Sequence, residues 1–149
     1  LSNMSFGITP LIEGRLNLTC VWGTLNVEEL KAMDDRILGL LENTQAPLVH
    51  GIQDYSKAEK IPSAKDLMLI KSGNHPQVGW VVIVGMDNKL MKFFVSAASQ
   101  VFNLRLRFMD TVVDALAFLQ DIDSTLPNLQ SVDLIAAEAR TRENAVTIQ

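Results

Sequence analysis

The chain has 149 residues, of which 48% are hydrophobic and 20% are charged, so it can bury one sizeable apolar core. Its formal net charge of -4 favours neither nucleic acid nor anionic lipid as a partner, since both attract clustered Lys and Arg. A single cysteine excludes an internal disulfide, and no apolar run reaches the ~20 residues of a membrane span or resembles a secretory leader. We therefore expect a cytoplasmic protein with no membrane span.

Two short apolar runs at the start of the chain predict an antiparallel hairpin. They cover residues 6–12 and 16–22, and the Glu13-Gly14-Arg15 segment between them suits a tight turn. The second run alternates, which directs one set of side chains at the core: Leu16, Leu18, Cys20 and Trp22. Cys20 is accordingly interpreted as a buried, unreactive thiol.

The next segment contains two helix starts with a strand between them. Asn26 is a predicted N-cap with Glu29 three residues later, and apolar residues follow at helical spacing up to Leu41. Residues 47–53 read as a strand, and the polar stretch 54–60 is expected to be a loop. Ser63 is the predicted N-cap of a second, short helix, with Asp66 three positions on.

Residues 78–84 form an unbroken Val- and Ile-rich run, which is typical of a strand buried on both faces. The helical spacing that follows over 89–102 predicts a crossover helix with two apolar stripes. The first stripe is expected to pack on the sheet, and it comprises Leu90, Phe93, Phe94, Ala97 and Val101. The second stripe is a candidate surface for a partner or a ligand, and it comprises Met91, Val95, Ala98 and Phe102.

An alternating segment, residues 104–108, predicts a strand near an edge of the sheet. Its Arg105 and Arg107 are open to two interpretations, an anion site or a device against unwanted strand pairing. Asp110 is the expected cap of the following helix.

The element order β-β-α-β-α-β-α-β-α predicts an α/β domain with a mainly parallel sheet and an antiparallel N-terminal strand. We place this domain at residues 1–122, and a polar linker with a C-terminal helical extension at 123–149. The extension carries an apolar stripe, Val132, Ile135, Ala136 and Ala139. It is expected to cover the second stripe of the 89–102 helix, either within one chain or in a homodimer.

Residues that commonly carry catalysis do not form a recognisable motif. The glycine-rich loops of nucleotide-binding proteins are absent, and neither His50 nor His75 has a second ligand at metal-binding spacing, so no cofactor and no metal are predicted. Asp54, Ser63 and His75 could meet at the carboxyl ends of the strands as a hydrolytic triad.

Several segments combine core and turn residues: Gly14-Arg15-Leu16-Asn17-Leu18, Trp22-Gly23-Thr24, residues 75–85, Phe108-Met109-Asp110-Thr111 and residues 115–119. These segments resemble the STAS fold, in particular its SpoIIAA-like branch of bacterial domains. The resemblance covers about residues 6–120 and implies a signalling or binding module without catalytic activity. In anti-sigma-factor antagonists of this fold, a switch serine lies at the start of a helix, and the residue that corresponds to it by position in this chain is Ser63. Ile61-Pro62-Ser63-Ala64 stands in place of their Asp-Ser-Ser-Gly-Leu motif, so Ser63 is either a switch or only a helix cap.

Two functions follow as hypotheses. The first is a non-enzymatic regulatory or protein-interaction module with an unidentified protein partner. The alternative is a carrier or sensor of a small apolar or lipid-like ligand, since this branch is also similar in fold to CRAL-TRIO lipid-transfer domains. A closed cavity lined by Trp22, Trp80, Phe93 or Phe94 would favour the carrier, and a filled core would favour the module.

Overall fold

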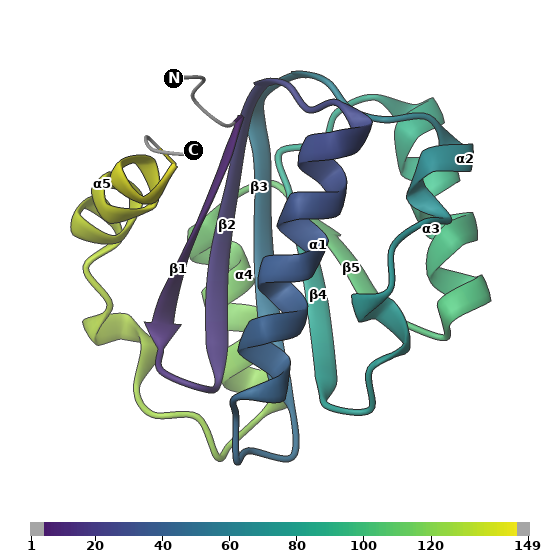
Figure 1. Ribbon diagram of the computed structural model, residues 1–149. Helices are drawn as coiled ribbons and strands as arrows, with labels where there is room; N and C mark the ends of the chain where they lie inside the picture. Colours follow the sequence, from purple (N-terminus) through teal and green to yellow (C-terminus); the bar gives the residue numbers. More distant parts are fainter. Residues whose placement is uncertain (1–4, 146–149) are drawn as a thin grey trace.

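A five-stranded sheet forms the centre of the protein in the computed structural model, which describes residues 5–145 (Figure 1). The strands lie side by side in chain order: β1 (Phe6–Ile12), β2 (Leu16–Thr24), β3 (Val49–Lys60), β4 (Val78–Val84) and β5 (Arg105–Met109). β1 is antiparallel to β2, and every other neighbouring pair is parallel. The predicted mixed α/β class is confirmed, and β4 is an interior strand.

Helices cover both faces of this sheet. One face carries α1 (Val27–Glu42), α2 (Ala64–Leu67) and α3 (Lys89–Phe102), and the other carries α4 (Val112–Ile122) and α5 (Leu134–Asn144). Two short 3-10 turns, Ser72–Asn74 and Leu129–Ser131, lie in the connections. Each face has its own core cluster, one around Leu18, Val82 and Leu119 and the other around Phe6, Val21 and Leu30.

Polar caps set the helix boundaries. The Asn26 side chain accepts a hydrogen bond from the Glu29 N–H at 2.9 Å, as predicted. α3 ends at Asn103, whose left-handed backbone (φ 56°) closes the last turn. The cap of α4 is Thr111 and not the expected Asp110, because the Thr111 hydroxyl reaches the Asp114 N–H at 3.1 Å.

The polar stretch 54–60 is strand, so the loop predicted there is wrong. Its backbone continues to pair with β2, through the register partners Trp22–Lys57 and Thr24–Lys60. Tyr55 and Ala58 of this stretch pack against the core cluster of the α1 face, but the other side chains are polar, so the pairing is held mainly by backbone hydrogen bonds to β2.

The two apolar stripes of α3 are exchanged relative to the prediction. Val95 and Ala98 pack against the core cluster of the α1 face, and Ser99, next to the second stripe on the helix surface, is buried. The stripe expected to face the sheet instead contains exposed side chains, including Leu90, Phe93 and Val101. Because the apolar arc is this wide, α3 could bury either stripe by rotating about its own axis. The packing against the sheet selects one of these two orientations.

The C-terminal extension packs on the sheet and not on α3, which corrects the expected covering role. α5 lies against β1 and β2, and its buried residues are Ala137 and Thr141, not the predicted stripe. Gly7 is necessary for this approach, because a Cβ there would overlap the backbone of Thr141. Leu126, Leu129 and Ala137 belong to the same core cluster as α4, so residues 123–145 complete that core.

Candidate functional site

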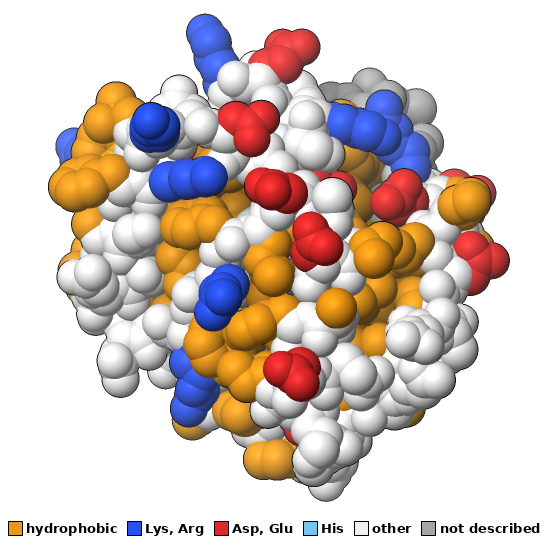
Figure 2. Space-filling model, turned by 180° about the vertical axis from the view of Figure 1, so that it is seen from behind, with side chains coloured by type: hydrophobic (Ala, Val, Ile, Leu, Met, Phe, Trp, Pro, Cys, Tyr) orange, Lys and Arg blue, Asp and Glu red, His pale blue; other side chains and the backbone are white. Residues whose placement is uncertain are grey.

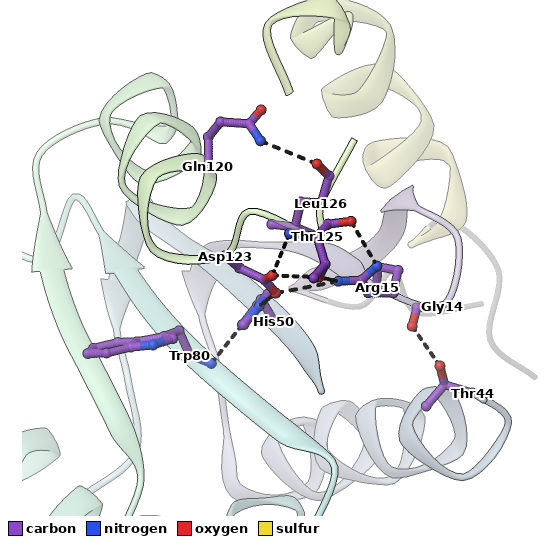
Figure 3. Close-up of polar contacts among 9 residues, drawn as sticks. All are labelled: Gly14, Arg15, Thr44, His50, Trp80, Gln120, Asp123, Thr125 and Leu126. Carbon is purple, nitrogen blue, oxygen red and sulfur yellow. Dashed lines mark hydrogen bonds and ion pairs between the residues drawn. The ribbon is translucent and has the colours of Figure 1, made fainter. Parts of the chain in front are cut away.

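A buried histidine joins three separate segments at the amino-terminal ends of the parallel strands (Figure 3). His50 is 2% exposed, and its Nδ1 accepts a hydrogen bond from the Trp80 backbone N–H at 2.9 Å. The ring proton therefore lies on Nε2, which donates to Asp123 Oδ2 at 2.8 Å. Since both ring nitrogens are occupied, His50 acts as a structural tie and has no free nitrogen for acid–base chemistry.

The Asp123 carboxylate is surrounded by donors. The Thr125 hydroxyl donates to Oδ1 at 2.6 Å, the Thr125 N–H donates to Oδ1 at 3.0 Å, and the Arg15 Nη2 lies 3.4 Å from Oδ2. The hydrogen bonds from Thr125 and from His50 hold the pKa of Asp123 well below its ordinary value. The cluster therefore binds the β1–β2 turn and the α4–α5 connection to the sheet through one ionised group.

The residues of the hypothetical triad each bond within their own segment. Asp54 accepts from the Ser56 N–H at 2.9 Å, the Ser63 hydroxyl donates to Asp66 at 3.1 Å, and His75 Nδ1 accepts from the Gln77 N–H at 3.1 Å. His75 precedes β4, so it lies at the end of the sheet opposite to the carboxyl-terminal half of β3, which holds Asp54. The structure does not bring these three side chains together.

Ser63 caps α2, as the sequence predicts. Its Oγ accepts a hydrogen bond from the Asp66 N–H at 3.3 Å, and the residue is exposed. α2 has only four residues, so little structure depends on this cap. The switch role of Ser63 stays a prediction.

An apolar cavity of about 120 Å³ lies between the sheet, α1 and α3. Three of the candidate ligand-binding residues line it, Val95, Ala98 and Phe102. None of the four aromatic residues expected to line a carrier cavity does so, because Trp80 packs edge-to-face on Phe118 on the other side of the sheet and Phe93 points outward. The binding role of Val95, Ala98 and Phe102 stays a prediction.

A larger groove of about 440 Å³ lies between α5 and the carboxyl-terminal halves of β2 and β3. Trp22 and Arg142 stand at its wall, with the guanidinium carbon 4.2 Å from the ring centroid. The other side chains combine both charges with apolar surface: Cys20, Asp54, Ser56, Lys57, Ile135, Glu138 and Ala139. Sequence analysis missed this groove, although Ile135 and Ala139 belong to the stripe that it singled out.

Cys20 in this groove is not activated for nucleophilic chemistry. Burial, followed by the nearby Asp54 and Glu138 carboxylates, raises the pKa of its thiol to about 12. The thiol is therefore protonated at neutral pH, in agreement with the unreactive role expected for it, whereas the predicted full burial is wrong because Cys20 is only partly buried and lines the groove.

Comparison with known proteins supports the fold. No family model matches the chain, and no curated protein matches it. Among solved structures, it is similar to an uncharacterised protein of the DUF3478 family with a SpoIIAA-like fold from Shewanella loihica PV-4. The two share 18% identity over 80% of this chain and 95% of that chain, with a TM-score of 0.57.

The chain has a SpoIIAA-like fold. This agrees with the STAS resemblance in the sequence, and at this identity the likeness is one of fold alone. Within residues 5–145, no helix is long and apolar enough to cross a membrane. The same residues contain no cluster of three His, Cys, Asp or Glu side chains that could hold a metal ion.

Proposed function

We propose that this SpoIIAA-like protein is a non-enzymatic regulatory or protein-interaction module, and that the groove beside α5 receives a segment of its protein partner. The groove itself is the observation that supports this most directly. It is concave, it presents Trp22 and Arg142 side by side, and its Ile135 is 85% exposed. Trp and Arg are the residues that most often dominate binding energy at protein interfaces.

The chemistry of the groove also indicates what kind of segment fits. Lys57 and Arg142 offer positive charge, Asp54 and Glu138 offer negative charge, and Ile135 with Ala139 provides apolar surface. A polypeptide with charged and apolar side chains in alternation matches such a surface better than a uniformly apolar molecule does.

A peptide-display selection against the whole protein tests this function. We expect the selected peptides to lose binding by at least about tenfold when Ile135→Glu and Ala139→Glu place charge on this apolar surface. Both side chains are exposed, so the fold should be retained. Val113→Glu on α4, at a residue that is 63% exposed, is the matched control. Peptides that bind the groove variant and the control equally well would contradict the proposal.

The cavity under α3 supports a second candidate, the binding of a small apolar ligand. Apolar cavities of about 150 Å³ bind molecules the size of benzene, whereas drug-sized ligands need about 300 Å³ or more. With about 120 Å³, this cavity suits a ligand of a few carbon atoms and not a lipid chain. Such a ligand would touch Ala98 on the inner side of α3.

Neighbouring alanines of α3 provide the test. Ala98 lines the cavity and Ala97 is exposed, so Ala98→Leu should fill the space that Ala97→Leu leaves unchanged. We expect benzene to raise the melting temperature of the wild type and of Ala97→Leu, and to leave that of Ala98→Leu unchanged. An equal effect of benzene on all three proteins would exclude this cavity as the site.

A further inference from the structure

Charge is distributed unevenly along this acidic chain. Residues 64–109 contain six Lys and Arg against two carboxylates, whereas the remainder contains seven against fifteen. Between Asp87 and Asp110 there is no carboxylate at all, but there are four cations, Lys89, Lys92, Arg105 and Arg107. The net charge of -4 therefore conceals a cationic region that consists of α2, β4, α3 and β5.

The same region exposes most of the large apolar side chains on the described surface. Eight such side chains are exposed in residues 5–145, and five of them lie at the end of α2 or on α3. These five are Met68, Leu69, Leu90, Phe93 and Val101. Together with Lys89 and Lys92 they make up what we call the α3 face. α2 and α3 are in contact, so the face is continuous.

The α3 face is a ridge and not a recess. α3 stands at the edge of the molecule beside β5, and its outward stripe carries Phe93 at 65% exposure and Leu90 at 60%. Lys92 lies on the flank towards β5, with its ammonium 5.7 Å from the centre of the Phe108 ring. Figure 2 shows the opposite side of the molecule, where Lys and Arg side chains border hydrophobic ones at the left.

We propose that the α3 face docks on an anionic lipid bilayer surface. Leu90 and Phe93 would enter the boundary between headgroups and acyl chains, while Lys89 and Lys92 stay at the level of the lipid phosphates. Apolar side chains on a protruding helix, with the exposed Lys89 on the same side and Lys92 on the flank towards β5, are the pattern of interfacial binding, in which the helix lies on the membrane and does not span it. This activity uses a different surface from the groove and goes beyond the proposed function.

The combination of positive charge and exposed apolar side chains argues against two other occupants of the α3 face. A second copy docked through the same face would bring the lysines of both copies into one interface, which costs energy. Nucleic acid would satisfy the cations but leave the exposed Leu90 and Phe93 without a role. An acidic protein remains as a competing partner, which the vesicle and peptide measurements below distinguish from a bilayer.

Co-sedimentation of the whole protein with lipid vesicles tests the proposal. One set of vesicles is phosphatidylcholine alone, and the other contains about 30% phosphatidylserine. We expect binding to the second set that exceeds binding to the first by at least about tenfold and weakens in high salt. Equal binding to both, or no binding to either, would overturn the proposal.

Paired variants locate the binding surface. Leu90→Ser with Phe93→Ser, and separately Lys89→Gln with Lys92→Gln, should each lower the partition onto anionic vesicles by about tenfold or more. Val113→Ser and Lys31→Gln with Arg140→Gln change exposed residues of α4, α1 and α5, and should alter it by less than about twofold. Circular dichroism confirms that each variant is folded.

Two results of this series would overturn the proposal. If the control variants weaken vesicle binding as much as the α3 variants do, the interaction is diffuse and the α3 face does not direct it. The second result is that the wild type does not co-sediment with vesicles but binds acidic peptides selected by display, and that the α3 variants no longer bind these peptides. The α3 face would then dock a protein and not a bilayer. The groove proposal is unaffected by either result, because its variants lie on α5.

Discussion

His50 Nε2 donates a hydrogen bond to Asp123 Oδ2 at 2.8 Å, although the two residues are 73 positions apart in the sequence. This bond fixes the end of α4 to the amino-terminal end of the central strand β3. The other nitrogen of the same ring receives the Trp80 N–H, so one buried side chain connects β3, β4 and the α4–α5 connection. This tie has consequences for stability that are separable from any binding activity.

Replacing Asp123 by Asn should destabilise the protein by about 2 kcal/mol, because the charged acceptor for Thr125, His50 and Arg15 is lost. The pKa of Asp123 in the folded protein lies below the ordinary value of 3.8. Its contribution is therefore complete above that pH and is lost as the pH falls below it.

Urea unfolding as a function of pH measures this effect. The wild type should lose more stability than Asp123→Asn between about pH 4 and pH 2. Asp110→Asn removes an exposed carboxylate and serves as the control. It should lose as much stability as the wild type over the same pH range. Parallel curves for the wild type and Asp123→Asn would show that the ionised Asp123 adds nothing to stability.

Gly79 is required for the position of His50. A Cβ at residue 79 would lie 2.8 Å from Cε1 of the imidazole, which is closer than carbon atoms approach without displacement. Gly79→Ala should therefore cost about 2 kcal/mol or more of unfolding free energy in a denaturant titration. Gly51→Ala, in the adjacent strand β3, meets no atom within 4 Å and should cost much less. Equal losses would mean that the ring can move aside freely.

Residues after Leu126 are expected to be necessary for stability, since Leu129 and Ala137 complete the core under α4 and β2. A chain that ends at Leu126 should melt at a lower temperature or aggregate. Ala137→Asp should reproduce most of this loss through a buried charge, whereas Ala139→Asp, at an exposed site two residues on, should be tolerated. An unchanged melting temperature on truncation would show that the extension covers nothing.

Ser63 is tested by separating its cap from its proposed switch. Ser63→Ala should lower the free energy of unfolding by about 1 kcal/mol or less, because it removes one exposed cap. A switch requires in addition that Ser63→Asp changes partner binding in a pull-down while the fold is kept. Ser131→Asp adds the same charge at another exposed serine and is the control. If the two Asp variants bind partners alike, Ser63 is only a cap.

The sequence alone determined the order of strands and helices along the chain, the caps Asn26 and Ser63, and the SpoIIAA-like class. These features depend on local patterns, such as the unbroken apolar run of Val78–Val84 and the Asn26–Glu29 spacing. For the site, the sequence indicated Ser63 as a cap and named three of the residues that line the cavity.

Only the tertiary structure decided which stripe of α3 faces inward, where α5 docks and how far β3 extends. Either of the two apolar stripes of α3 could face the sheet, because both have helical spacing. Which of them does so depends on the packing against the sheet. The strand character of residues 54–60 depends on backbone hydrogen bonds to β2, which carry no residue code. No local sequence pattern relates His50 to Asp123, because they are 73 residues apart in the chain. Only folding brings the donor and the acceptor to within 2.8 Å of each other.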